Sequence, residues 1–445
     1  MISDRHTAII YTSAICNLKC TYCYIDKNPA LKKIDDILDE SFKGDYYFNF
    51  IREMFPDPNQ LTSIETWGGE PFIAMNRCYN LLHQLIGYYN NFNSFFSSTN
   101  LTTSDWIDQF SGLVKVFSKY PDKKFDVTLQ LSIDGPEYIT DMNRGVGVTK
   151  KFIENFHKLL EFCKESLPDN IDLKLQPKPT FDNNCIRLMD TKEKIIEYYH
   201  FMEGFLSKVK NLNKSNVTMS PNIPNTASPY PHTVEDGRIF ANLCRLTREI
   251  EKENKIHKYF KFYTNITMYS RGYNCNESMT LKCTNFTCGT GYTNVGFLPY
   301  DRISNCHNGF VDLISDYKKL CIQSKDEHTI DFRLFMEKSK SRFCLTKEQY
   351  KLYESQMQKY NVPDTTARLS NMVVIIMTLA QAGQILDIYK DPEEALKAAR
   401  FIRNKTAFCV RDNHAITGSL TLQPVGIFKL LLNGAKEVIE EDEQC

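Results

Sequence analysis

The sequence predicts an α/β fold: a partial (β/α)6 TIM-like barrel, then a small cysteine-bearing region and a helical C-terminal region. Three observations predict it. Up to about residue 225, short β-rich runs alternate with longer helical stretches, which is typical of parallel β/α units. The sequence then becomes rich in turns and cysteines, and after Asp364 its apolar periodicity is helical again. We therefore expect three domains, at residues 1–228, 229–349 and 350–445.

Six β-rich runs are the expected strands, and helical stretches separate them. In chain order they are HTAIIYTS, TSIETWGG, NSFFSSTN, DVTLQLSID, DLKLQPKPT and NVTMSPNIP. Six parallel units close most of a barrel, and in such folds the functional residues collect in the loops at the C-terminal ends of the strands. Near the C-terminus, SNMVVIIMTLAQAGQILDIY and PEEALKAARFIR are expected helices, and Pro392 stands in the first turn of the second.

Composition and charge argue against several classes of partner. The chain has 54 Lys and Arg against 54 Asp and Glu, so no overall field favours nucleic acid or an anionic membrane. The N-terminus lacks the basic flank, apolar segment and cleavage site of a secretory signal. The longest apolar stretch, residues 372–380, is about half as long as a membrane-spanning helix. We expect a cytoplasmic protein without nucleic-acid or membrane partners.

The 15 cysteines of the chain are better explained by metal binding or catalysis than by disulfides, because we expect a reducing compartment. A triplet, Cys16-x3-Cys20-x2-Cys23, directly follows the first expected strand. Three soft ligands with no nearby histidine suit an iron–sulfur cluster with one iron left open, whereas structural zinc would need a distant fourth ligand. Five other cysteines stand alone and are expected to be buried structural thiols: Cys78, Cys163, Cys185, Cys244 and Cys409.

With Tyr22 before its last cysteine, the triplet resembles the signature of the radical S-adenosylmethionine superfamily. The resemblance implies a [4Fe-4S] cluster on Cys16, Cys20 and Cys23, with S-adenosylmethionine bound through its amino and carboxylate groups to the open iron. It further implies a reducing electron donor of the flavodoxin or ferredoxin kind, and a 5′-deoxyadenosyl radical that abstracts hydrogen from the substrate. Tyr22 would lie beside the adenine.

Two further segments resemble this family at the ends of the second and third strands. W-G-G-E-P resembles the family's GGE motif, in which Gly68 and Gly69 let a ligand approach the backbone and Glu70 accepts from an ammonium group. A plain turn is the alternative for this segment. Thr-Asn after the third strand resembles the family's T-N-G, with Leu101 in place of the glycine, so Asn100 is a further candidate for cofactor binding.

The fourth strand ends in S-I-D-G-P, followed by D-M-N-R-G, which resembles the peptide-modifying branch of the family. By this resemblance, Ser132 contacts the ribose or carboxylate end of the cofactor. Arg144 contacts its carboxylate, a role that suits a rigid guanidinium group. The alternatives are turn chemistry at Asp134-Gly135-Pro136 and a solvated charge at Arg144.

A second set of cysteines begins with Cys283-x4-Cys288-G-T-G and continues to Cys306. It resembles the start of the auxiliary-cluster domain called SPASM, or its shorter form Twitch, which implies a SPASM/Twitch-like second domain. Asp301 stands where that family usually has a glycine, and the dense cysteine block expected downstream is absent. We expect one auxiliary cluster, on Cys283, Cys288, Cys306 and Cys344. The alternative is a degenerate region that binds no metal.

His307 directly follows Cys306, where sulfatase-maturing relatives carry an aspartate proposed as a base. It is the catalytic candidate of this region, since histidine moves protons near neutral pH, but a lone histidine is more often a packing or surface residue. The sequence predicts a radical enzyme that modifies a peptide or protein side chain after translation. The alternatives are a non-catalytic iron–sulfur or electron-transfer protein on the same fold and a radical enzyme acting on a small molecule.

Overall fold

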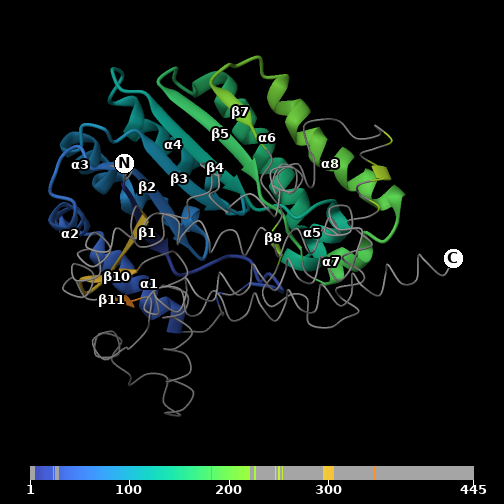
Figure 1. Cartoon of the computed structure of the whole chain (residues 1–445), viewed down its shortest axis with the longest axis horizontal. Coiled ribbons are helices and arrows are strands. Elements are labelled where there is room, and N and C mark those ends of the chain that lie inside the picture. The colour runs from blue at the N-terminus through green and yellow to red at the C-terminus, as the bar shows by residue number, and fades with distance from the viewer. Residues whose placement is uncertain are drawn as a thin grey trace, which may run out of the picture.

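The computed structural model describes residues 6–23, 25, 30–181, 183–220, 225–226, 246, 249–250, 253, 294–304 and 344–345. Within them the chain is an α/β structure with a mostly parallel sheet flanked by helices (Figure 1). The six expected strands are all present. They are β1 (His6–Ser13), β2 (Leu61–Gly68), β3 (Ser94–Thr99), β4 (Phe125–Leu131), β5 (Ile171–Pro177) and β7 (Val217–Met219).

These six strands lie side by side in the order in which they occur along the chain, and every neighbouring pair is parallel. The order never reverses, in contrast to a doubly wound sheet, which has a switch point where the strand order turns back. Helical segments connect the strands. They are α1 (Ala30–Ser41), α2 (Tyr46–Met54), η1 (Pro71–Ile73), η2 (Met75–Cys78), α3 (Tyr79–Tyr88), α4 (Trp106–Ser118), α5 (Glu137–Arg144), α6 (Val148–Ser166), α7 (Asn183–Leu188) and α8 (Lys192–Lys210).

Strands from later in the chain extend the sheet beyond β1. β9 (Asn294–Leu298) pairs with β1 in parallel, and β10 (Arg302–Ser304) and β11 (Cys344–Leu345) continue the sheet as antiparallel strands. A separate pair, β6 (Thr180–Phe181) and β8 (Asn225–Thr226), lies outside the main sheet. Residues 229–349, expected to form a second domain, therefore contribute strands to the first sheet. The expected C-terminal helices lie outside the described residues.

The hydrophobic core lies between the sheet and the helices. Alternate strand residues such as Ile10 and Val127 point into it and are almost fully buried. At the start of α4, Trp106 stacks between Phe72 and Phe110, with ring centroids 5.0 and 5.3 Å away. Figure 1 shows α3, α4, α6 and α8 along one side of the sheet. This packing holds the strands in register, so that their carboxyl ends meet at one edge.

Helix α6 illustrates why these segments are helical. Its buried side chains recur at the three- and four-residue spacing of one helix face; they include Phe152, Phe156, Leu159, Leu160 and Cys163. The opposite face carries Lys and Glu. Among the residues that the structure describes, no helix has the length and apolar character that a membrane crossing requires.

Candidate functional site

The candidate site is the edge of the sheet formed by the carboxyl ends of the parallel strands. Cys16, Cys20 and Cys23 lie in the loop after β1, and all three side chains are partly exposed. The loops after β2, β3 and β4 carry the other predicted residues of the first domain. Hydrogen bonds tie these three loops to the cysteine loop, as described below, so the four sequence segments form one site.

The isolated cysteines differ from those of the loop. Cys78, Cys163 and Cys185 are buried, which confirms the prediction of buried structural thiols for these three. Cys244 and Cys409 lie outside the described residues. Burial raises the pKa of Cys163 to about 12, against the smaller opposing effect of Lys214. Such a thiol stays protonated, and only a thiolate is a good metal ligand.

The cysteine loop offers three thiols as a donor set. In the described part of the chain, no group of three or more His, Cys, Asp or Glu side chains is placed to hold a metal ion. A cluster makes a different demand, because its thiolates bond to separate irons and need not converge on one point. The donors are three accessible thiols with no carboxylate or imidazole among them. This donor set fits an iron–sulfur cluster.

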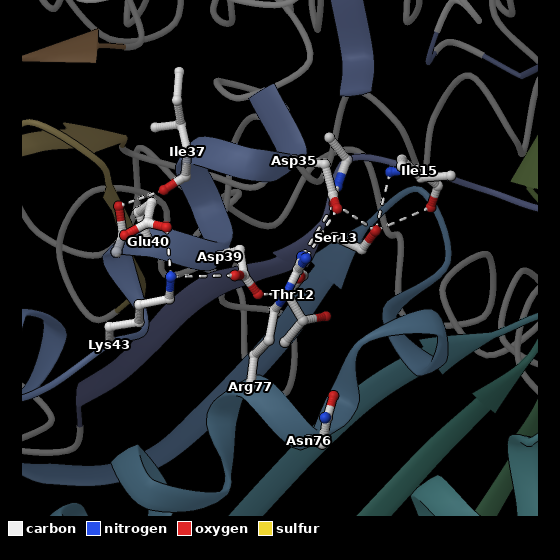
Figure 2. A network of polar contacts seen from close by, with 12 residues as sticks. Thr12, Ser13, Ile15, Asp35, Ile37, Asp39, Glu40, Lys43, Asn76 and Arg77 are labelled. Atoms are coloured by element: carbon white, nitrogen blue, oxygen red, sulfur yellow. Dashed lines mark hydrogen bonds and ion pairs between the residues drawn. The ribbon is translucent and has the colours of Figure 1, made fainter. Parts of the chain in front are cut away.

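The carboxylate of Asp35, in α1, fixes the chain where it leaves β1 (Figure 2). Its Oδ1 accepts from Ser13 Oγ at 2.8 Å and from the backbone N–H of Ala14 at 2.9 Å. Ser13 Oγ in turn accepts from the N–H of Ile15 at 3.0 Å. Burial alone would raise the pKa of Asp35, but hydrogen bonds from Arg77 and Ser13 outweigh it and hold the pKa below its usual value. Asp35 therefore stays ionised and orients the residue before Cys16.

Arg77, in η2, completes this network by reaching toward Asp35 and Asp39 of α1 (Figure 2). Its Nη2 lies 3.0 Å from Asp35 Oδ2, its Nε donates to Asp39 Oδ1 at 2.7 Å, and its Nη1 donates to the carbonyl of Thr12 at 2.8 Å. Sequence reasoning missed this pair. The signal was present, since Asp35 interrupts the apolar stripe of α1 formed by Leu31, Ile34 and Leu38, and a carboxylate on an apolar face needs a partner.

Gly68 and Gly69 bring the end of β2 against the chain leaving β1. The N–H of Gly69 donates to Ser13 O, and the N–H of Glu70 donates to Ile15 O, both at 2.9 Å. A Cβ at Gly68 would lie 1.9 Å from Ser13 O, and one at Gly69 would lie 2.3 Å from Ile15 O. Gly68 also has a φ of +142°. The paired glycines are therefore required by contact between two backbones, whether or not a ligand also approaches them.

Glu70 is buried between the ends of β2 and β3. Its Oε1 accepts from the N–H of Phe72 at 3.1 Å and its Oε2 from the N–H of Asn100 at 2.6 Å. Burial raises the pKa of Glu70 to about 7, because desolvation outweighs these hydrogen bonds and the attraction of Arg144. The Thr99 hydroxyl is a third hydrogen-bond donor to this carboxylate. The predicted contact of Glu70 with an ammonium group stays a prediction.

Asn100 joins the third strand to the cysteine loop. Its Nδ2 donates to Asn17 Oδ1 at 2.9 Å and lies 3.8 Å from Cys16 Sγ. Its Oδ1 accepts from both the N–H and the hydroxyl of Thr102, and the Thr102 hydroxyl accepts from Asn17 Nδ2 at 2.9 Å. Asn100 is 5% exposed and its polar atoms are occupied. Its contact in this structure is therefore with the cysteine loop, and its role in cofactor binding stays a prediction.

Leu101 stands at the glycine position of the T-N-G motif that this segment resembles, and it adopts a left-handed backbone with φ +58°. This conformation is rare for a residue with a side chain. Its N–H donates to Thr99 Oγ1 at 3.0 Å and its carbonyl accepts from Asn155 Nδ2 at 2.8 Å. The side chain is fully buried. Surrounding contacts thus hold a backbone shape that glycine would adopt without strain.

Asp134, at the end of β4, is the centre of a second buried network. It accepts from Arg144 Nε at 2.9 Å and Nη2 at 2.8 Å, from the hydroxyl of Tyr22 at 2.6 Å, and from the N–H of Thr180 at 2.9 Å. Asp134 is fully buried and Arg144 is 6% exposed. Arg144 is therefore not a solvated charge, and that alternative is wrong. Sequence reasoning treated Asp134 only as a turn residue, although the turn is real and Gly135 has a positive φ.

Further contacts fix the cysteine loop against the same end of the sheet. The N–H of Thr21 donates to the carbonyl of Asn143 at 2.8 Å, and the guanidinium carbon of Arg144 lies 5.5 Å above the ring of Tyr22. Ser132 is half-buried beside this network, and its N–H donates to Thr99 O at 2.8 Å. The contacts of Tyr22, Ser132 and Arg144 with a cofactor stay predictions.

The second predicted site is not described. Cys283, Cys288, Cys306 and His307 lie outside the described residues, and of Cys344 the structure gives only its place in β11. Comparison with protein-family models finds no match, and comparison with curated proteins finds none.

The close contact at Gly69 predicts that alanine substitution changes the free energy of unfolding differently at Gly69 and at Gly87. Gly69→Ala puts a methyl group into Ile15 O, so we expect it to lower the free energy of unfolding by about 1–3 kcal/mol. Gly87→Ala is the control, because nothing lies near its Cβ and it is in α3, where alanine gains up to about 1 kcal/mol. Urea denaturation compares the two. Equal effects would contradict the requirement for close approach.

Asp134→Asn removes the charge that faces Arg144 and leaves a buried guanidinium without its counter-ion. We expect a loss of about 3–5 kcal/mol in the free energy of unfolding. Asp126→Asn, at an exposed position in β4, should change it by less than about 0.5 kcal/mol. Tyr22→Phe removes one hydrogen bond and should lie between them, at about 1 kcal/mol. An Asp134→Asn variant as stable as Asp126→Asn would exclude this network as a major stabilising contact.

The raised pKa of Glu70 predicts that stability depends on pH. Between about pH 4.5 and 7 the unfolded chain has lost the proton that the folded chain keeps, so stability falls as the pH rises through this window. Over the window, wild type should lose on the order of 1–3 kcal/mol more than Glu70→Gln. Urea denaturation at several pH values measures the difference, with exposed Glu154→Gln as the control. Parallel curves for wild type and Glu70→Gln would show that Glu70 does not titrate there.

Proposed function

We propose that this chain is a radical S-adenosylmethionine enzyme. Its cluster would be held by Cys16, Cys20 and Cys23, and its substrate would be a side chain of a peptide or protein. The observation that carries the proposal is the convergence of four segments at one sheet edge: Asn100 approaches Cys16, Glu70 binds the Asn100 backbone, and Tyr22 binds Asp134. Unrelated loops that merely resembled a motif would not need to be linked in this way.

Backbone conformation gives independent support. Four non-glycine residues of the described chain have a positive φ, and two of them, Leu101 and Asp301, stand where the family and its auxiliary domain have glycine. Asp301 follows Tyr300 in the turn between β9 and β10, with φ values of +56° and +59°. Positive φ is uncommon outside glycine. Its recurrence at both positions favours the same backbone in this chain as in the family.

Strand order supports the proposed architecture. Six parallel strands that follow one another without a switch point, with helical crossovers, favour a partial (β/α)6 barrel over a doubly wound sheet. Functional groups of such a barrel lie at the carboxyl ends of the strands, which is where the cysteine loop is found. We propose the barrel as the fold of the described part, with a SPASM/Twitch-like region after it.

Each residue of the site would have a distinct role. Bound at this edge, S-adenosylmethionine would supply a 5′-deoxyadenosyl radical, which takes hydrogen from the substrate. Cys16, Cys20 and Cys23 would hold the cluster. Glu70, with a pKa of about 7, would receive an ammonium group, and the positive charge would favour its ionised form. Asp134 neutralises Arg144 and fixes Tyr22, which keeps the loop in one conformation.

The partners proposed for this enzyme are a peptide or protein substrate and a reducing flavodoxin- or ferredoxin-like donor. An auxiliary cluster on Cys283, Cys288, Cys306 and Cys344, and proton transfer by His307, remain proposals from the sequence alone. They do not enter the test of the main proposal, which concerns the cysteine loop.

The test is anoxic reconstitution, followed by iron analysis and by assay for 5′-deoxyadenosine after reduction with dithionite. Wild type should bind at least about four irons and form 5′-deoxyadenosine. Changing Cys16, Cys20 and Cys23 together to Ala should remove about four irons and abolish the product. Cys163→Ala, a buried thiol, is the control and should keep both.

Three outcomes separate the alternatives. Wild type without iron would overturn the proposal. A full cluster without 5′-deoxyadenosine would favour the non-catalytic iron–sulfur protein. Iron that remains in the triple variant would indicate a second cluster and strengthen the assignment to the peptide-modifying branch.

A further inference from the structure

Lys178 lies at the edge of the sheet that carries the candidate site. It directly follows β5, and its backbone N–H donates to Leu131 O, at the end of β4, at 2.8 Å. Two residues later, the N–H of Thr180 donates to Asp134 Oδ1. The segment that contains Lys178 is therefore attached to the network of Asp134, Arg144 and Tyr22.

The ammonium group of Lys178 has no anionic partner in the described part of the chain. Other half-buried lysines there donate to backbone carbonyls: Lys123 to Ile86 O at 2.9 Å, and Lys214 to Leu167 O at 2.9 Å. No such acceptor is found for Lys178 among the described residues. Burial lowers the pKa of Lys178 to about 8, and no neighbouring charge contributes to the shift. At neutral pH the group is still mainly the cation.

Arg144 cannot provide the positive charge for binding a carboxylate ligand at this edge. Its Nε and Nη2 are both bound to Asp134, and the pair is buried and neutral as a unit. A carboxylate that came to this edge would meet little net positive charge from Arg144. Lys178 is the cation on the same segment for which no carboxylate partner is found in the described part of the chain, and an ammonium in a desolvated place is stabilised by an anion.

We propose that Lys178 binds the carboxylate of a ligand at this edge of the sheet. The inference rests on the proposed function, which supplies two sources of that chemistry: the methionine carboxylate of S-adenosylmethionine and a carboxylate of the peptide substrate. This inference differs from the family resemblance, which implies that Arg144 contacts the carboxylate of the cofactor. In this chain Arg144 orients the cysteine loop through Asp134 and Tyr22, and Lys178 is the anion-binding residue.

The test is the rate at which Lys178 is acetylated by sulfosuccinimidyl acetate, mapped by peptide mass spectrometry on the reconstituted full-length protein without reductant. Lys174 is the control, because it is an exposed lysine on the same strand. The first pair of probes is S-adenosylmethionine and 5′-methylthioadenosine, which lacks the carboxylate. The second pair, used with S-adenosylmethionine present, is N-acetylglycine and N-acetylglycinamide. A ligand at about ten times its Kd should slow labelling of Lys178 about tenfold and leave Lys174 unchanged.

Comparison of the probes identifies which ligand supplies the carboxylate. Protection by S-adenosylmethionine and not by 5′-methylthioadenosine assigns Lys178 to the cofactor. Protection that requires N-acetylglycine, and is not given by N-acetylglycinamide, assigns it to the substrate. Labelling of Lys178 that none of the probes changes by more than about twofold overturns the inference, since a bound carboxylate must compete with the reagent.

Variants give a second readout by equilibrium dialysis. If the cofactor is the source, Lys178→Met should weaken binding of S-adenosylmethionine about 10-fold to 100-fold and leave 5′-methylthioadenosine binding unchanged, as expected for loss of one charged hydrogen bond. Lys174→Met should change neither. Iron content equal to wild type shows that the variant has folded. An unprotected Lys178 in a protein with a full, active cluster refutes this inference alone, whereas a wild type without a cluster refutes the proposed function.

Discussion

The candidate site depends on one constraint, the close approach of two backbones where β1 and β2 end. There is no room for a side chain at Gly68 or Gly69, and two N–H groups of β2's end donate to the chain that leaves β1. Asp35 and Arg77 close this contact from the helix side with a largely buried ion pair. Removing one partner would leave a poorly solvated charge, so this pair directs the chain into the cysteine loop.

Three buried carboxylates organise the edge of the sheet, and they differ in what neutralises them. Asp35 and Asp134 each face an arginine, whereas Glu70 is bound by backbone N–H groups and the Thr99 hydroxyl, and no ion pair of Glu70 is found among the described residues. Desolvation therefore raises the pKa of Glu70 to about 7, while Asp35, held by Arg77, stays ionised. Glu70 thus differs from Asp35 and Asp134 in having no arginine partner among the described residues, and it is the carboxyl group to which the proposed ammonium contact is assigned.

The sequence predicted the strands well because the alternation of β-rich runs is a local signal: the expected run HTAIIYTS coincides with β1, His6–Ser13. It also located the cysteine loop and the motifs that follow β2 to β4. It did not predict that β9, some 290 residues later, would pair with β1, because strand pairing at such separation leaves no local pattern. Nor did it find the pairs Asp35–Arg77 and Asp134–Arg144, since partners are set by tertiary packing. The reason for the two glycines was likewise visible only in three dimensions.

Leu101 has a left-handed backbone beside the cysteine loop, and its buried contacts explain how a residue with a side chain is accommodated there. A left-handed residue with a side chain carries about 1–2 kcal/mol of strain, which glycine would avoid. The chain tolerates this strain because the leucine side chain is buried, its N–H is bound by Thr99 and its carbonyl by Asn155. Those contacts keep Asn100 against Cys16 and Glu70. The left-handed backbone at Leu101 is therefore held by specific buried contacts, and through Asn100 these contacts fix the end of β3 against the cysteine loop.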